Sequence, residues 1–345
     1  MRVDLGPAGR WRHDLSHCLH TTAGVLLTFH GLDPVRVLGA GWGFSHRPGD
    51  VRREEYFFPG EGPLFADLAP HHAVSSVWHE PADADSGWRE VRAKLAAGTP
   101  VAVAADNFHL PFRPAYRDVH TNHLLTVFGF DDEAGEVLVA DPVPPAFQGA
   151  ISLETFTAAR DSGNPIRHDR DMFFTANPIG NRWLELVVGP EQPAFDLGFV
   201  RHVLAANAAA LGEGRVTPGL VTGLAGLRHT LTGLLERYEG DEVAVDDLFI
   251  LGGAVLAVTG LHAEFLALAG RRFGMSGLGE LARSVDRIAH HWAAFRIAVA
   301  TGRADRAAAV PGLLARAERL LAAYEVVAGE MACLGTVAAR VRVPA

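Results

Sequence analysis

The sequence contains only two cysteines among its 345 residues, Cys18 and Cys333. Two cysteines so far apart do not form the framework of disulfides that stabilises small secreted proteins. We therefore expect a reduced, cytoplasmic protein in which a catalytic thiol stays free. Cys333 follows Met331 and Ala332 in a region of helical periodicity, so we expect it to be buried in a helical core.

Long apolar segments and an excess of positive charge are also missing. The longest apolar run, Phe249–Val258, is too short to span a bilayer, and no signal-peptide pattern follows Met1. The formal net charge of −9 excludes a general nucleic-acid binder. We therefore expect neither a membrane nor a nucleic acid as partner.

Motifs for metal and phosphate binding are incomplete. His13, His17 and His20 have helical spacing beside Cys18, but no second cysteine is near and no glutamate stands between the first two histidines, as it does in a zinc-protease helix. The glycine-rich segment 39–43 lacks the lysine and the hydroxyl residue of a phosphate-binding loop. We therefore expect no metal site and no cofactor held by the protein.

Cys18 stands where the sequence pattern predicts the start of a helix. Apolar residues recur after it at spacings of three and four, Asp14 or Ser16 can cap the helix, and Gly31 can end it. The positive end of a helix dipole favours a thiolate and can lower a thiol pKa from about 8.5 to roughly 3.5–7.5. Cys18 is therefore a candidate nucleophile, the alternative being a small buried hydrophobic residue.

A predicted β-hairpin carries His123 where its first strand starts and Asp141 where its second strand ends. If the turn holds the five residues 131–135, Asp141 stands opposite Leu125 and is the diagonal neighbour of His123 on the same face. A turn of even length would send the two side chains to opposite faces. The odd turn therefore predicts a contact between the imidazole and the carboxylate.

The order of these three residues suits covalent catalysis. A thiol attacks a carbonyl well when a histidine takes its proton and a carboxylate or amide fixes the imidazole. A cysteine on an early helix, a histidine on a strand and an aspartate on the next strand follow the order of papain-like folds. The sequence therefore predicts a triad of Cys18, His123 and Asp141.

Six segments together carry a resemblance to a known family. Residues 10 to about 190 resemble the N-terminal domain of the butirosin biosynthesis protein H family in the segments His17–Thr22, His30–Asp33, Leu38–Phe44, Asp106–Phe112, His120–His123 and Val139–Pro142. The helical remainder, including Leu261–Leu266, resembles the C-terminal region that is usually joined to this domain. The resemblance implies a fold similar to papain and to C39-type peptidases, but biosynthetic chemistry. The family's type member moves an aminoacyl group from an acyl carrier protein to an aminoglycoside amine.

The resemblance implies roles for individual residues. Cys18 would be the nucleophile, His123 the general base and Asp141 its orienting partner. Papain-type sites often use a glutamine upstream of the cysteine as oxyanion donor, and none stands here. His13, His17 or backbone N–H groups of the Cys18 turn would then bind the oxyanion.

The glycine-rich segment has two interpretations. A tight backbone approach there would let Trp42 and Phe44 line a substrate channel. The same residues would also suit simple core packing, and the sequence does not separate the two.

Composition divides the chain into two predicted domains. Residues 1–190 mix helices with short strands as an α+β, papain-like domain, whose last strand is expected at 183–188. Residues 194–345 form an all-α domain after a proline-rich linker. Its helices are expected near 197–211, 219–239, 245–270, 276–303 and 306–335.

The function that these features predict is a cysteine-dependent acyltransferase of secondary metabolism. It would move an aminoacyl or peptidyl group from a carrier-protein thioester, bound through phosphopantetheine, to a small-molecule amine. A thioesterase, cyclase or amide hydrolase with the same triad is the alternative, as is a non-catalytic relative that binds a carrier. A homodimer is a further expectation.

Overall fold

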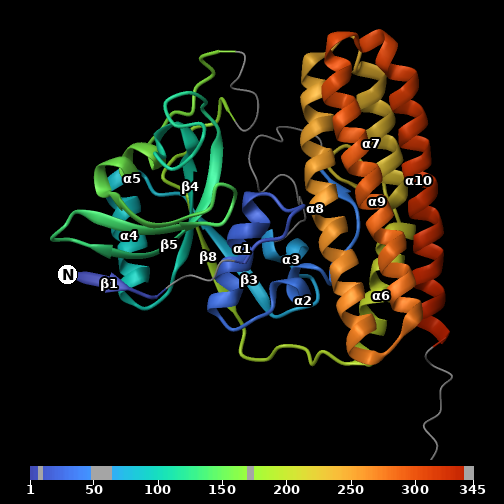
Figure 1. Ribbon diagram of the computed structural model, residues 1–345, viewed down its shortest axis with the longest axis horizontal. Helices are drawn as coiled ribbons and strands as arrows, with labels where there is room; N and C mark the ends of the chain where they lie inside the picture. The colour runs from blue at the N-terminus through green and yellow to red at the C-terminus, as the bar shows by residue number, and fades with distance from the viewer. Residues whose placement is uncertain (7–10, 48–63, 169–174, 338–345) are drawn as a thin grey trace, which may run out of the picture. The chain divides into compact units, whose positions relative to one another are not determined.

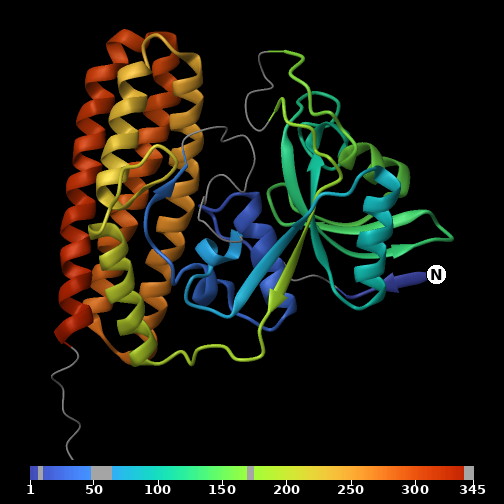
Figure 2. The same cartoon turned by 180° about the vertical axis from the view of Figure 1, so that it is seen from behind.

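The computed structural model describes residues 1–6, 11–47, 64–168 and 175–337 (Figures 1 and 2). The described residues fall into two compact units. Unit 1 holds residues 1–34 and 74–189, and unit 2 holds residues 35–47, 64–73 and 190–337. The change of unit at residue 190 lies where the linker was expected. The single expected boundary, however, puts residues 35–73 in the first domain, whereas their described parts belong to unit 2.

Unit 1 is built on a seven-stranded sheet whose adjacent strands are antiparallel. The order is β3-β8-β4-β5-β6-β7, and β1 pairs with β5. The strands are β1 (Arg2–Asp4), β3 (Val74–His79), β4 (Val101–Asp106), β5 (Asn122–Asp131), β6 (Glu136–Asp141), β7 (Phe147–Ser152) and β8 (Trp183–Val188). The last strand has the bounds that the sequence pattern predicts.

Helices cover both faces of this sheet. Helices α4 (Ala84–Ala96) and α5 (Leu153–Arg160) lie on one face, and α1 (Cys18–Phe29) lies on the other (Figure 1). Apolar residues alternate along the strands to make the core under α4 and α5, as Val103 and Leu125 do. A one-turn 3₁₀ helix, η2 (Asn107–His109), follows β4.

The β5–β6 hairpin differs from its prediction near the turn. Asp131 pairs with Glu136, so the turn holds four residues rather than the expected five. A bulge between Val127 and Gly129 then shifts the register by one residue. Beyond the bulge Thr126 pairs with Ala140, which is the register that the odd turn predicts. The extra residue in the strand therefore compensates for the shorter turn.

Unit 2 is dominated by five long helices. They occupy the five predicted regions and are α6 (Leu197–Gly212), α7 (Gly223–Arg237), α8 (Glu242–Phe273), α9 (Ser276–Thr301) and α10 (Arg306–Val337). The shorter elements are α2 (Pro34–Leu38), β2 (Ser45–His46), α3 (Leu64–Leu68), β9 (Val221–Thr222) and η3 (Gly302–Ala304). The fold class, an α+β region followed by an all-α region, is confirmed.

Helices α8 and α9 pack closely at a glycine. A Cβ atom on Gly252 would stand 2.7 Å from Cγ of Arg296, so only glycine allows this approach without a shift. The guanidinium of Arg296 lies over the ring of Phe249 and donates to the Phe249 carbonyl.

The apolar run predicted as a buried helix lies in this stretch of α8. By length and composition α8 is the one described helix that could cross a membrane, and 61% of its apolar window is buried in the protein.

Both cysteines are free, but their surroundings differ from the prediction in one case. Cys18 is half-buried at the start of α1. Cys333 is exposed on α10, so its expected core position is wrong. Met331 is fully buried, and a residue two positions further along a helix points to the opposite side.

Candidate active site

Buried polar residues gather at one end of the sheet in unit 1. Because the strands are antiparallel, β4 ends, β5 starts and β6 ends at the same place. We call this group the polar end; its members are Asp106, Asn107, His120, Asn122, His123 and Asp141, all at most 7% exposed. Burying so many polar groups costs free energy unless they bind one another or a ligand. The polar end is therefore the candidate active site.

His123 and Asp141 form a hydrogen-bonded pair in the polar end. Nε2 of His123 lies 2.8 Å from Oδ2 of Asp141, and both side chains are almost fully buried. The contact predicted from the hairpin is thus present. Because Asp141 engages Nε2, Nδ1 is the ring nitrogen left to serve a reacting group.

Asp141 has two further partners. Nη1 of Arg113 donates to the same carboxylate oxygen at 3.2 Å and to the Val143 carbonyl at 2.9 Å, and the Val143 N–H donates to Oδ1 at 3.0 Å. Burial alone would raise the pKa of Asp141, but His123, Arg113 and this N–H together hold it below its ordinary value. The carboxylate therefore stays ionised beside the imidazole. The sequence pattern gave no signal for Arg113.

Cys18 is the first residue of α1. The cap is His17, whose Nδ1 accepts the Leu19 N–H at 3.3 Å, and neither expected cap, Asp14 or Ser16, has this place. Ser16 instead donates to the His13 carbonyl. The sulfur therefore stands at the N-terminus of a 12-residue helix, where the dipole favours an anion.

Helix α1 and strand β5 run in the same direction. The hydroxyl of Thr22 donates to the Leu124 carbonyl at 3.2 Å, and Val25, further along the helix, packs with Phe128, further along the strand. Cys18 lies one turn before Thr22 on the same side of the helix. It is therefore directed toward the start of β5, the end that holds His123.

The alternation of side chains adds a constraint. His123 stands opposite Ala105, and Asp141 follows Val139 by two residues, so both face the core under α4 and α5. Helix α1 packs on the other face of the sheet. Any contact between the Cys18 sulfur and the imidazole would therefore have to pass around the end of the sheet.

The three N-terminal histidines do not share one helical face as their spacing predicts. His13 precedes α1 in a turn, and its Nδ1 accepts the Leu15 N–H at 3.3 Å. His17 and His20 are adjacent, with ring centroids 4.6 Å apart. Burial, and then the charges of His17 and His13, lower the pKa of His20 well below its ordinary value. His13 and His17 remain predicted oxyanion donors.

Trp42 and Phe44 lie in the interior of unit 2. The indole of Trp42 stacks on His262 and on Tyr324, each with centroids 5.2 Å apart, and its Nε1 donates to Thr259. Phe44 is 5% exposed. These contacts are those of core packing, and the substrate channel that both residues were expected to line stays a prediction.

A second imidazole–carboxylate pair lies in the polar end. Nδ1 of His120 is 2.6 Å from Oδ2 of Asp106, and the Ser162 hydroxyl donates to the same oxygen at 2.6 Å. The Phe108 and Thr121 N–H groups donate to the other oxygen. Asp106 thus fixes both ends of the segment between β4 and β5. The sequence suggested a strand end at Asp106 but gave no sign of this network.

Metal ligands do not converge in the part of the chain that the structure describes. No group of three or more histidine, cysteine, aspartate or glutamate side chains there has an arrangement that could hold a metal ion.

Comparison with known proteins assigns a family to this region. Residues 17–142 match the family model described as butirosin biosynthesis protein H, N-terminal. The match confirms the predicted resemblance to the butirosin biosynthesis protein H family over residues 17–142. No curated protein matches the chain significantly. The matched segment starts beside Cys18 and ends just after Asp141, and it supports a biosynthetic enzyme with an acyl-transfer-related function.

Proposed function

We propose that the protein is a cysteine-dependent acyltransferase that uses Cys18, His123 and Asp141. The observation that carries the proposal is the buried His123–Asp141 pair at the end of the sheet toward which α1 directs Cys18. The papain-like character of unit 1 belongs to the same proposal. So does a cytoplasmic location, which would keep the thiol reduced.

The proposed reaction has two balanced steps. In the first, His123 takes the thiol proton, the Cys18 sulfur attacks the donor thioester carbonyl, and the bond to the donor sulfur breaks as that sulfur receives the proton. In the second, an amine attacks the acyl-enzyme, its proton passes to His123, and the Cys18 sulfur leaves as a thiol. No oxidation or reduction occurs. Asp141 orients the imidazole and stabilises its charged form.

The proposed partners follow from this chemistry. The donor is a carrier protein whose phosphopantetheine arm bears an aminoacyl or peptidyl group, and the acceptor is a small-molecule amine. Water as acceptor would make the protein a thioesterase or hydrolase, and an amine within the acyl group would make it a cyclase. A homodimer stays a prediction.

Intact-mass spectrometry tests the proposal. The full chain, in a Cys333→Ser background that removes the exposed thiol, is mixed with aminoacyl thioesters of a carrier protein and of N-acetylcysteamine. We expect a mass increase of one acyl group, which a later addition of amine removes with formation of an amide.

The matched control is Cys18→Ala in the same background, which should gain no mass. Release of free acid at one rate with and without amine would point to hydrolysis instead of transfer. An equal adduct on the Cys18→Ala variant would overturn the role of Cys18.

A further inference from the structure

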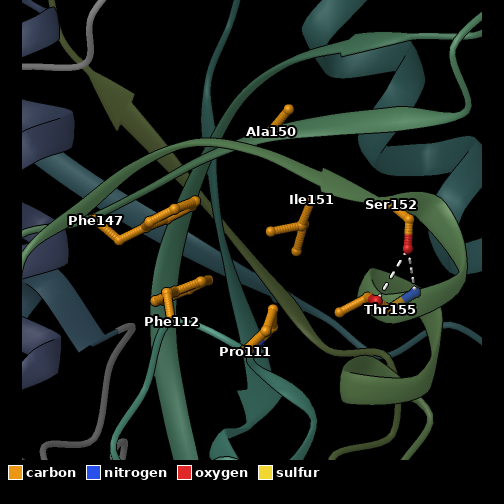
Figure 3. Close-up of a pocket in the computed structure, with 7 residues that line it drawn as sticks. All are labelled: Pro111, Phe112, Phe147, Ala150, Ile151, Ser152 and Thr155. Carbon is orange, nitrogen blue, oxygen red and sulfur yellow. Dashed lines mark hydrogen bonds between the residues drawn. The ribbon is translucent and has the colours of Figure 1, made fainter.

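A cavity of about 400 Å³ lies beside the polar end, along the edge strand β7 (Figure 3). The residues after η2 and the first turn of α5 complete its wall. Phe112, Phe147 and Ile151 are its large apolar lining residues. Ser152 and Thr155 line the other end. The cavity has the size and lining of a small-ligand site.

Two residues that line the cavity, Phe112 and Phe147, lie next to Asp141 and its partner Arg113. Phe147 stands directly opposite Asp141 in the pairing of β6 with β7, so both side chains are on one face of the sheet. The ring of Phe112 stacks on Phe147, with centroids 4.1 Å apart and planes 4° apart. The next residue is Arg113, which donates to Asp141. The aromatic wall is thus built from the neighbours of the carboxylate.

The lining favours a neutral, apolar occupant. None of the described residues that line the cavity carries a charge. The two hydroxyls in its wall form a hydrogen bond with each other: Ser152 Oγ donates to Thr155 Oγ1 at 2.9 Å. Ser152 Oγ also accepts the Thr155 N–H at 3.1 Å. From Phe147 to Ser152 the strand extends about 17 Å, enough to accompany an extended chain.

We propose that this cavity binds the apolar part of the acyl group that the donor thioester carries. The proposal rests on the proposed function and deepens it, because it names the acyl groups that the enzyme prefers. An acyl group held at the polar end extends along β7, past the Phe112–Phe147 stack and toward Thr155. Acyl groups with an aliphatic or aromatic portion gain free energy by its burial, and short ones do not.

The first test compares acylation rates across chain length. N-acetylcysteamine thioesters from acetyl to octanoyl are mixed with the full chain in the Cys333→Ser background, and acyl-enzyme is followed by intact mass. We expect the second-order rate constant of acylation to increase with each added methylene, by at most about fourfold, until the cavity is filled. A flat series in the wild-type cavity would overturn the proposal.

A matched set of variants locates the effect. Thr155→Phe fills the cavity and should reduce the preference for octanoyl over acetyl at least about tenfold. Thr155→Val keeps the volume and should keep the preference. Ala158→Phe adds the same ring at an exposed position of α5 and should leave the series unchanged. An unchanged preference in folded Thr155→Phe would place the acyl group elsewhere.

A binding measurement separates this proposal from the proposed function. Cys18→Ala is titrated by calorimetry with the octanoyl amide that replaces the thioester sulfur with N–H. Binding that Thr155→Phe abolishes supports the cavity even if no acyl-enzyme forms, an outcome that would refute only the catalytic proposal. Acyl-enzyme formation without chain-length preference and without amide binding refutes only the cavity.

Discussion

Two buried histidines, one in each unit, show how an interior can use the same side chain in different ways. His123 in unit 1 bonds a carboxylate that Arg113 also holds. Among the described residues, His262 in unit 2 bonds a carbonyl alone, that of Gly39, at 2.7 Å, and it stacks on Trp42. A carboxylate can stabilise an imidazolium, whereas a single carbonyl in an apolar core does so much less.

The pKa of His262 reflects this difference. Burial lowers it to about 4, although the Gly39 carbonyl opposes the shift. His262 is therefore a neutral packing residue at physiological pH, and its polar contact fixes the segment 39–44 on the long helices. The comparison teaches that the partner, rather than burial, distinguishes a candidate base from a structural histidine.

The largest effect is expected when the carboxylate partner is removed. Asp141→Asn keeps the shape but loses the charge, so the imidazolium formed in each step is no longer stabilised. We expect the rate of acyl-enzyme formation to fall by about 10²–10⁴-fold. Stopped-flow or quenched mass spectrometry measures it, with circular dichroism as the control for folding. A loss below about threefold would remove the contrast between the two histidines.

The next effect is on stability and concerns His262. Because its folded pKa lies below the ordinary 6.5, the unfolded chain binds more protons, and stability falls as the pH drops from about 6.5 toward 4. At about pH 5 this residue should cost about 2 kcal/mol of unfolding free energy relative to about pH 7.5.

Urea unfolding of wild type and His262→Phe at both pH values measures this contribution. The difference between the two proteins should shift by that amount in favour of the variant at the lower pH. A difference independent of pH would mean that His262 is not the buried neutral group described here.

The third prediction concerns Arg113, the second partner of Asp141. Arg113→Gln removes a cation that holds the pKa of Asp141 down, so that pKa rises and the acid limb of the acylation rate moves to higher pH. We expect about a tenfold loss of rate at about pH 5 and a smaller loss at about pH 8.

Arg113→Lys is the control, since it keeps the charge and should restore most of the acid limb. An equal loss at all pH values in both variants would show that Arg113 acts only in folding.

The last effect is confined to the unit 2 core. Tyr324→Phe removes the hydroxyl that accepts from Trp292 Nε1 at 3.0 Å and faces Thr259. The buried indole N–H then loses its acceptor, which should cost about 1–3 kcal/mol of unfolding free energy. Chemical denaturation measures it, and acyl-enzyme formation should stay unchanged. A loss of activity would contradict the division between a catalytic and a structural cluster.

The sequence predicted the elements better than the surroundings of its polar residues. Periodicity and turn residues predicted the long helices and β8, because these signals are local. The contact of His123 with Asp141 was predicted, but from a turn one residue longer than the one observed. The bulge between Val127 and Gly129 corrects the register, and no local pattern indicates a bulge.

Partners that are distant in sequence escaped prediction. Arg113 and Ser162 reach their carboxylates from loops, and the network of Asp106 joins three separate segments. For Trp42 the sequence left a substrate channel and core packing open, and the contacts of its ring with Thr259, His262 and Tyr324 could not be read from it. Such contacts depend on tertiary packing, which a single sequence does not display.

The pH dependence of Cys18 alkylation is the measurement that tests the central claim most directly. The rate of iodoacetamide reaction is followed by mass in the Cys333→Ser background, for the otherwise wild-type chain and for His123→Gln. If the sulfur and the imidazole act together at the polar end, the chain that keeps His123 should react at pH values well below the ordinary thiol pKa of about 8.5. In His123→Gln the inflection of the alkylation rate against pH should move toward that value. One shared inflection near 8.5 in both proteins would contradict the account.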